Sequence, residues 1–312
     1  MAFESVHALD AESLELFAMK GTRGGPGIPM VGNANGYKVR RVMQITRDLA
    51  TVPFAELRIL DLACGEGVYA IESALRGAGV VAVDSRTERM NEGARAAERI
   101  KLTNIRFERN DVRAVTARSH GHFDVIFFLG IMYHLDAGDV VSTLHNIYEM
   151  CRRFVVIDTH VALSKRCQVE LSGRTYEGEE VREHSDDDPE SVRRSRLLAS
   201  MDNATSFWFS RESLFRLLHD IGFTSVYECI VPREPFKPEN RVTVVAMKGT
   251  PVKISSYPWM NDKTETEIEA LFDGGVRDLS GRAGTGRRGS ARMIKRAVNK
   301  TLRVFGFELR RI

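Results

Sequence analysis

The stretch from Arg58 to Tyr69, which reads RILDLACGEGVY, constrains the fold more than any other part of this chain. A short apolar run ends on a carboxylate at Asp61, and a turn with Gly65 and Gly67 then opens a helical pattern. Strand, acidic residue, glycine loop and helix in this order predict a nucleotide-type site at the carboxyl edge of a parallel sheet. The loop also matches the relaxed dinucleotide fingerprint, so on its own it leaves the ligand open.

The charges beside this loop favour a cationic ligand. The pyrophosphate of a dinucleotide seeks backbone N–H groups and a helix N-terminus, not a nearby carboxylate. S-adenosylmethionine (SAM) has no phosphate and carries an ammonium and a sulfonium, so Asp61 is attractive to it. Glu66 adds a second negative charge in the same turn. The sequence therefore favours SAM over a dinucleotide.

The next predicted strands end in polar or small residues as well. Residues 79–84 form an all-apolar run that ends in a carboxylate, 23 positions after Asp61, about the separation expected for an acid that binds a ribose hydroxyl. A helical stretch (88–100) follows, then a third strand (104–112) ending in Asn-Asp and a fourth strand (123–130) with a glycine at its tip. Each strand thus ends where a ligand crevice is expected.

This succession resembles the class I SAM-dependent methyltransferases over roughly Leu57 to Leu163, and the resemblance resumes near Phe207. It implies an α/β fold with a Rossmann-like, mostly parallel seven-stranded sheet, helices on both faces and an antiparallel C-terminal hairpin. The short link between the last two predicted strands, 224–231 and 241–248, also reads as a hairpin connection. Ala63 stands where the family usually has its first glycine, and we expect this small residue to be tolerated.

The resemblance also implies the cofactor contacts. The acid and glycines of the first loop would face the methionine part of SAM, the acid after the second strand the ribose, and the residues after the third strand the adenine. Any one of these acids could simply cap a strand or a helix, but the ordered set argues against that interpretation. The implied cofactor-binding residues are Asp61, Ala63, Gly65, Gly67, Asp84, Asp111, Val112 and Leu129.

A closer resemblance lies in three later segments, 129–135 (LGIMYHL), 207–209 (FWF) and 214–223. They are similar to the branch that contains the tRNA wobble-uridine carboxymethyltransferases. They are equally similar to uncharacterised bacterial methyltransferases from cell-surface glycan and natural-product gene sets. Because the wobble-uridine enzymes use a carboxylated derivative of SAM, the choice between SAM and that derivative stays open.

Methyl transfer to a hydroxyl requires a base, since an alcohol is a poor nucleophile until its proton leaves. The candidates at the ends of the fourth and fifth strands are His134, His160 and Asp158, with His134 the preferred base or substrate contact. The alternatives are a structural histidine at a helix start and strand-end polar groups without a catalytic role. The predicted substrate contacts are Tyr133, Asn203, Trp208 and Arg211, although a tryptophan such as Trp208 more often packs in the core than binds an acceptor.

The cysteines and the apolar pattern bear on metals and localisation. Four cysteines are scattered without CxxC or Cys-His spacing, which argues for reduced thiols and against a zinc site, so we predict no metal. The N-terminus is acidic and lacks the features of a signal peptide, and no apolar stretch reaches 18 residues. These features predict a cytoplasmic protein.

The chain divides into five predicted parts. The first, 1–53, is a helical cap with helices at 9–19 and 37–50 and a glycine-rich stretch between them, which is either a connector or a lid. Residues 54–163 form the SAM-binding core with a fifth strand at 153–160, and 207–248 complete the fold. Between them, the charged segment 164–206 is predicted as an inserted substrate cover, with a solvated surface excursion as the alternative. Residues 249–312 form a tail.

The end of the tail is strongly basic. From Arg282 to Ile312 it holds ten Lys or Arg and one acid, a net charge of +9, so the remainder carries about −6. Met293, Ile294, Val298, Leu302 and Phe305 share one helical face and basic residues the other, as in helices that bind an anionic membrane surface or nucleic acid. A helix docked on its own domain or in a homodimer is the alternative. If the tail binds a membrane, we expect the protein at the inner face of the membrane.

These observations predict a SAM-dependent methyltransferase that acts on a small-molecule or glycan-linked acceptor, at oxygen rather than nitrogen. An alternative is a tRNA-modifying methyl- or carboxymethyltransferase, which would need a basic groove beside the site, whereas the chain outside its tail is net acidic. A SAM-binding regulatory protein without turnover is another alternative. An NAD-linked oxidoreductase is less favoured.

Overall fold

The computed structural model describes residues 31–196, 199–230, 237–250 and 266. Almost all of them belong to the first of two compact units, which spans 1–252; the second spans 253–312. The helix predicted at 9–19, the glycine-rich stretch after it and the basic tail therefore lie outside the described residues.

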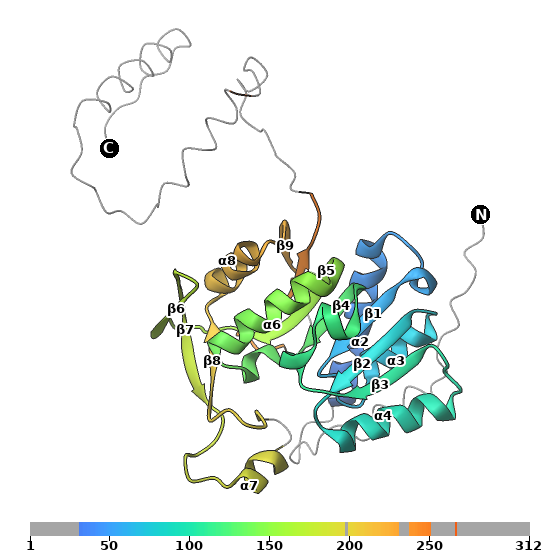
Figure 1. Ribbon diagram of the computed structural model, residues 1–312, viewed down its shortest axis with the longest axis horizontal. Helices are drawn as coiled ribbons and strands as arrows, with labels where there is room; N and C mark the ends of the chain where they lie inside the picture. Colours follow the sequence, from blue (N-terminus) through green and yellow to red (C-terminus); the bar gives the residue numbers. More distant parts are fainter. Residues whose placement is uncertain (1–30, 197–198, 231–236, 251–265, 267–312) are drawn as a thin grey trace, which may run out of the picture. The chain divides into compact units, whose positions relative to one another are not determined.

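A seven-stranded sheet forms the centre of the first unit, with the strand order β3-β2-β1-β4-β5-β10-β9 (Figure 1). The first five strands run parallel, and β10 pairs antiparallel with both β5 and β9. The predicted fold class, with its mostly parallel sheet and antiparallel end, is confirmed. The strands are β1 (Arg58–Leu62), β2 (Gly79–Asp84), β3 (Ile105–Arg109), β4 (Phe123–Leu129), β5 (Cys151–His160), β9 (Ser225–Glu228) and β10 (Arg241–Met247).

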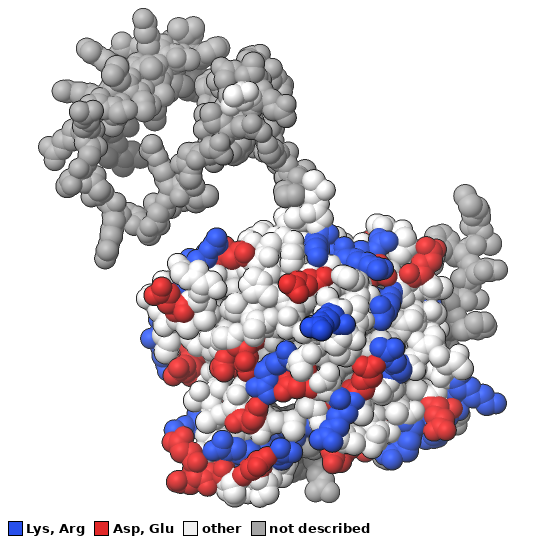
Figure 2. All heavy atoms as spheres, viewed as in Figure 1, with Lys and Arg blue, Asp and Glu red and all other residues white. Residues whose placement is uncertain are grey.

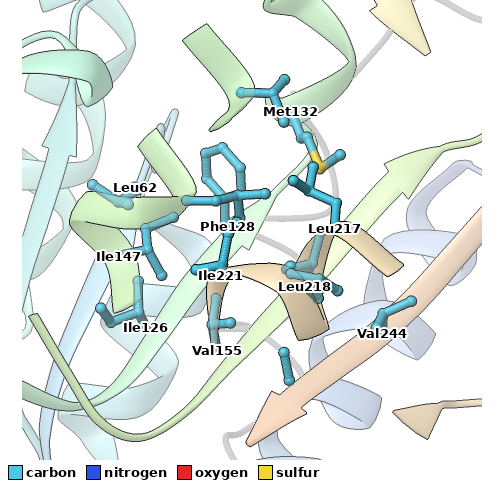
Figure 3. Packing of buried hydrophobic residues seen from close by; sticks show 14 of the residues in the cluster. Leu62, Ile126, Phe128, Met132, Ile147, Val155, Leu217, Leu218, Ile221 and Val244 are labelled. Atoms are coloured by element: carbon cyan, nitrogen blue, oxygen red, sulfur yellow. The ribbon is translucent and has the colours of Figure 1, made fainter. Parts of the chain in front are cut away.

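Helices cover both faces of this sheet, as predicted. Because successive side chains of a strand point to opposite faces, Ile59 packs with the helices α2 and α3, whereas Leu60 and Leu62 pack with α6 and α8. Figure 3 shows the second face, where Ile147 of α6 and Leu217 of α8 lie over the sheet. The helices are α2 (Val31–Ala50), α3 (Val68–Leu75), α4 (Thr87–Arg99), α5 (Ala117–His120), α6 (Ala137–Met150), α7 (Glu190–Ser195) and α8 (Arg211–Ile221), with short 3-10 helices η1 (Phe54–Glu56), η2 (Val112–Ala114) and η3 (Met132–His134).

The inserted segment, predicted as a substrate cover with a solvated surface excursion as the alternative, contains strands that the sequence did not predict. The strands β6 (Cys167–Leu171) and β7 (Arg174–Arg182) form an antiparallel hairpin, and β7 also pairs with β8 (Thr205–Phe209). This second sheet packs on the core through Tyr176, Phe207 and Phe209, all buried. A few large apolar residues among many charged ones are sufficient to bury one face of the small sheet.

The surface carries charges of both signs. Figure 2 shows Lys, Arg, Asp and Glu interspersed on the visible face, without a continuous patch of one sign. Within the part of the chain that the structure describes, no helix combines the length and the apolar character needed to cross a bilayer.

Candidate functional site

The loop between β1 and α3 runs through left-handed backbone conformations. The φ angles are +58° at Ala63, +57° at Gly65 and +72° at Gly67. A Cβ atom at Gly67 would lie 2.6 Å from the ring of Phe107, so this position has both a conformational and a steric need for glycine. Ala63 adopts the left-handed region despite its Cβ, which agrees with a family preference for glycine there.

Asp61 is the most unusual group of this crevice. It is 1% exposed, and its Oδ2 atom has no hydrogen-bond partner among the described residues. Burial, and then the charge of Asp84, raise the pKa of Asp61 to about 8, against a smaller lowering by a backbone hydrogen bond from Ala70. Without a ligand this carboxyl is therefore largely protonated at neutral pH, and a bound cation would favour its ionised form.

The second predicted negative charge, on Glu66, is not available to a ligand. Both of its carboxylate oxygens accept hydrogen bonds from Arg89, at 2.7 Å each. Burial acts to raise the pKa of Glu66, but the hydrogen bonds and charge of Arg89 outweigh it and hold that pKa below its ordinary value. The expectation that Glu66 contributes to an acidic rim was wrong, since Arg89 neutralises it.

The other predicted cofactor residues lie at neighbouring strand ends. Asp84 is buried at the end of β2 and accepts hydrogen bonds from the backbone N–H groups of Gly65, at 2.8 Å, and Arg86, at 2.7 Å. The structure thus brings the glycine loop and this acid together. Asp111 caps η2 and pairs with Arg113, Val112 is buried, and Leu129 ends β4.

The inserted segment lies against these strand ends. The guanidinium of Arg86 donates to the backbone carbonyls of Arg194, Arg196 and Ala199 at 2.7–3.0 Å. Arg113 pairs with Asp202 as well as with Asp111. Arg86 and Arg113, each two positions after a predicted ribose or adenine acid, therefore hold the end of the insertion.

A second polar cluster surrounds the end of β5. Asp158 is buried and accepts from Arg241 Nε at 2.5 Å, Thr243 Oγ1 at 2.8 Å and Lys237 Nζ at 3.4 Å. Burial acts to raise the pKa of Asp158, but the charges of Arg241 and Lys237 outweigh it and lower that pKa. A carboxylate held in this way is a poor proton acceptor.

Each ring nitrogen of His160 also has a hydrogen-bond partner. Its Nδ1 lies 3.1 Å from Asn240 Oδ1, and its Nε2 lies 3.2 Å from Arg241 Nη1. Because a guanidinium only donates, Nε2 accepts and the proton sits on Nδ1. Burial and the charge of Arg241 lower the pKa of His160, which keeps the ring neutral. The ring stacks on Trp208 at 4.8 Å, so His160 is better suited to line an acceptor pocket than to act as a base.

His134 differs from both. Its side chain is 14% exposed, and its Nδ1 lies 2.8 Å from Glu183 Oε1. The other oxygen of Glu183 accepts from the backbone N–H of Ser200 at 3.1 Å. Burial acts to raise the pKa of Glu183, but the hydrogen bond with His134 outweighs it and keeps that pKa low. Sequence reasoning missed Glu183, because nothing distinguishes it from the other acids of the charged insertion.

Three of the four predicted substrate residues gather around His134. The ring of Tyr133 lies 4.3 Å from that of His134, and the Tyr133 carbonyl accepts from Trp208 Nε1 at 2.9 Å. Asn203 Nδ2 donates to the His134 carbonyl at 3.3 Å. Arg211 is not brought into this cluster, since its guanidinium pairs with Glu228 at 2.6 Å.

Comparison with known sequences points to one enzyme class. Residues 59–153 match the model of a methyltransferase domain. The chain is similar to the ubiquinone biosynthesis O-methyltransferase of Azotobacter vinelandii, with 31% identity over 101 residues, or 31% of this chain and 41% of that protein. The corresponding enzyme of Psychrobacter cryohalolentis is 31% identical over 87 residues, or 28% of this chain and 34% of that protein. The chain thus matches less than half the length of these relatives.

Comparison with solved structures agrees. The N-terminal domain of EvdMO1, in a crystal structure with S-adenosylhomocysteine (SAH) bound, aligns with a TM-score of 0.54 and 19% identity over 78% of this chain and 99% of that one. The same domain in the presence of SAH and D-fucose aligns with a TM-score of 0.53 and 20% identity, with equal coverage. At this level of identity the likeness shows a shared fold.

Proposed function

We propose that this protein is a SAM-dependent O-methyltransferase for a small hydroxyl-bearing acceptor, a proposal that starts from the methyltransferase domain at residues 59–153. The sheet has the mostly parallel order and antiparallel end that the class I methyltransferase resemblance implied. The curated relatives are O-methyltransferases, which favours oxygen as the methylated atom.

The observation that carries the proposal is the Oδ2 atom of Asp61, which has no hydrogen-bond partner among the described residues. A buried carboxyl oxygen without such a partner is costly, and a cationic ligand would relieve that cost. The residues around it therefore fit SAM: Asp61 would face its ammonium, Gly65 and Gly67 would let the chain approach it closely, and Asp84 would accept from the ribose hydroxyls. When bound, SAM supplies a methyl group on a sulfonium, whose carbon–sulfur bond breaks with the electron pair returning to sulfur.

The residues of the second cluster would handle the acceptor. Its hydroxyl oxygen forms the new bond to the methyl carbon, and His134 takes the hydroxyl proton on its Nε2 atom. The proton then passes from the imidazolium to water, so that the products are a methyl ether and SAH. Tyr133, His160 and Trp208 supply an aromatic wall that suits the flat face of a ring, whether aromatic or glycosidic.

The transfer itself depends mainly on alignment. Correct orientation of the two reactants lowers the activation barrier by up to about 7–11 kcal/mol, and a general base increases the rate by a further factor of roughly 10²–10⁴. The tRNA alternative draws no support from the visible face of the described residues, where charges of both signs are interspersed (Figure 2). The acceptor, including whether it is glycan-linked, and any contact of the basic tail with a membrane stay predictions.

The proposal is tested first by binding. Calorimetry should give heat with SAM and with SAH, and NADH should give none. The purified protein is then incubated with methyl-tritiated SAM and a panel of vicinal diols, phenols and sugars, and products are identified by mass spectrometry. A product that carries one new methyl group on oxygen supports the proposal. Failure to bind SAM and SAH would refute it, and SAM binding without any acceptor in cell extracts would favour a regulatory protein.

A further inference from the structure

We infer that Glu183, supplied by the inserted segment, is the positioning residue of His134: it holds the imidazole proton on Nδ1 and leaves the Nε2 lone pair for the acceptor. The inference rests on the proposed function, because it assigns a base to the hydroxyl that this function requires. It also gives the insertion a part in the chemistry in addition to covering the site.

The protonation pattern follows from the contacts. Glu183 is held ionised, with its pKa below the ordinary value, and an ionised carboxylate only accepts hydrogen bonds. The bond of 2.8 Å between its Oε1 and His134 Nδ1 therefore places the hydrogen on Nδ1. A neutral imidazole has one hydrogen, so Nε2 carries the lone pair. Carboxylates orient the histidines of hydrolase triads in the same way.

Glu183 is fixed in its own place, which a positioning residue requires. Its side chain is 8% exposed, and its second oxygen accepts from the backbone N–H of Ser200. The same stretch of chain is held by Arg86, through the Ala199 carbonyl, and by Arg113, through Asp202. The carboxylate therefore approaches His134 in a geometry set by the insertion as a whole.

The substitution Glu183→Gln tests this arrangement sharply. The Ser200 N–H can only donate, so it selects the carbonyl oxygen of the glutamine amide. The NH₂ group then faces His134 Nδ1 and requires that atom to accept. The hydrogen of His134 must move to Nε2, and the lone pair is lost from the atom that would meet the acceptor. Asp187→Asn is the matched control, since Asp187 is an exposed acid of the same segment.

Two measurements are independent of the acceptor. Nitrogen-15 NMR of histidine-labelled protein, with His134 assigned through His134→Asn, should show the Nδ1–H form in wild type and Asp187→Asn and the Nε2–H form in Glu183→Gln. Diethyl pyrocarbonate, which acylates an imidazole nitrogen that carries a lone pair, is then used as the probe, with the His134 peptide followed by mass spectrometry. We expect the rate at His134 to fall roughly tenfold or more in Glu183→Gln, as the hydrogen now occupies Nε2.

The outcomes separate the possibilities. A purely structural pair would leave His134 unreactive toward the reagent in wild type, and that result overturns the inference. An unchanged tautomer in Glu183→Gln overturns it as well. Calorimetry with SAH is run on the same samples and should give equal affinity within about twofold, because Glu183 lies outside the Asp61 crevice. If wild type does not bind SAH, the proposed function is refuted. The tautomer and the reactivity of His134 would still test the role of Glu183.

Discussion

Replacing Asp61 by asparagine should make the ligand-free protein more stable and its SAM complex weaker. The carboxyl is buried beside Asp84, and one of its oxygens lacks a hydrogen-bond partner among the described residues. Asparagine has nearly the same shape and does not ionise. The substitution therefore removes a buried group that must stay protonated at a free-energy cost that grows with pH, and it also removes the group that would bind the ammonium of SAM.

The pKa values give the sign and the size of the effect. In the native state the pKa of Asp61 is about 8, and its ordinary value is 3.8, so the native state holds a proton that the unfolded chain has already lost. Stability must then fall as pH rises from about 4 to about 8. At 1.36 kcal/mol for each pKa unit, the shift corresponds to a loss of about 6 kcal/mol in the free energy of unfolding. This figure is an upper limit, because relaxation of the protein and entry of water reduce it. We expect Asp61→Asn to gain about 2–4 kcal/mol over wild type at pH 8.5, and much less at pH 5.

Urea unfolding of the ligand-free proteins at pH 5, 7 and 8.5 measures this difference directly. The other ionisable groups are shared, so they cancel between wild type and Asp61→Asn. Asp187→Asn, which removes an exposed carboxylate, should follow wild type at each pH. SAM binding at pH 7 should release about one proton from wild type and none from Asp61→Asn, as read from calorimetry in buffers of different ionisation enthalpy.

Two results would refute the reasoning. If the stability difference between wild type and Asp61→Asn does not widen from pH 5 to pH 8.5, the carboxyl is not buried and protonated as the structure indicates. If Asp61→Asn binds SAM with wild-type affinity, the carboxyl does not hold the methyl donor, whatever its effect on stability.

Three further predictions concern other parts of the fold. Ala63→Gly should raise the melting temperature by about 1–4 °C in a thermal scan, because relief of a left-handed alanine (about 1–2 kcal/mol) exceeds the entropy that glycine adds to the unfolded chain. Arg86→Ala removes the contacts to three carbonyls of the insertion, so trypsin should cut near Arg196 several-fold faster than in wild type, with the exposed Arg95→Ala as control. Asp158→Asn leaves Arg241 without its buried partner and should cost about 3–5 kcal/mol in urea at pH 7. Because the pKa of Asp158 is depressed, that contribution should be present above pH 4 and be lost as pH falls further.

The parallel half of the sheet was predictable because its signals are local. Strands such as β2 and β4 are short, mainly apolar runs bounded by a turn residue, as expected for strands buried on both faces. The glycine loop was equally clear, since left-handed backbone selects for glycine at Gly65 and Gly67. Its one departure, Ala63, adopts the same conformation and fits the same loop.

The second sheet was not predictable in the same way. In β7 the buried residue Tyr176 is surrounded by charged neighbours, so the alternation that marks a half-buried strand is weak. The pairing of β7 with β8 joins segments that lie more than twenty residues apart, and no local pattern records such a partner. For this reason the strands of the insertion were not predicted from the sequence.

The roles of the candidate acids and bases also depend on contacts between distant parts of the chain, which the sequence does not show. Glu66 and Asp61 lie five residues apart and look alike in the sequence, but only the fold shows that Arg89, from α4, neutralises Glu66. His160 ends one apolar strand and His134 follows another. The fold shows that Arg241 and Asn240 contact the two ring nitrogens of His160, whereas Glu183 contacts Nδ1 of His134. The role of an ionisable group is set by partners that are distant in the chain.

The insertion connects the two halves of the site. Arg86 and Arg113 follow the two acids predicted to hold the ribose and the adenine, and both bind the end of the insertion that also supplies Glu183. If the insertion opened, the contacts beside the cofactor and the carboxylate behind His134 would be lost together. In the proposed function, the residues assigned to the cofactor and the carboxylate that orients His134 therefore depend on the same segment of the chain.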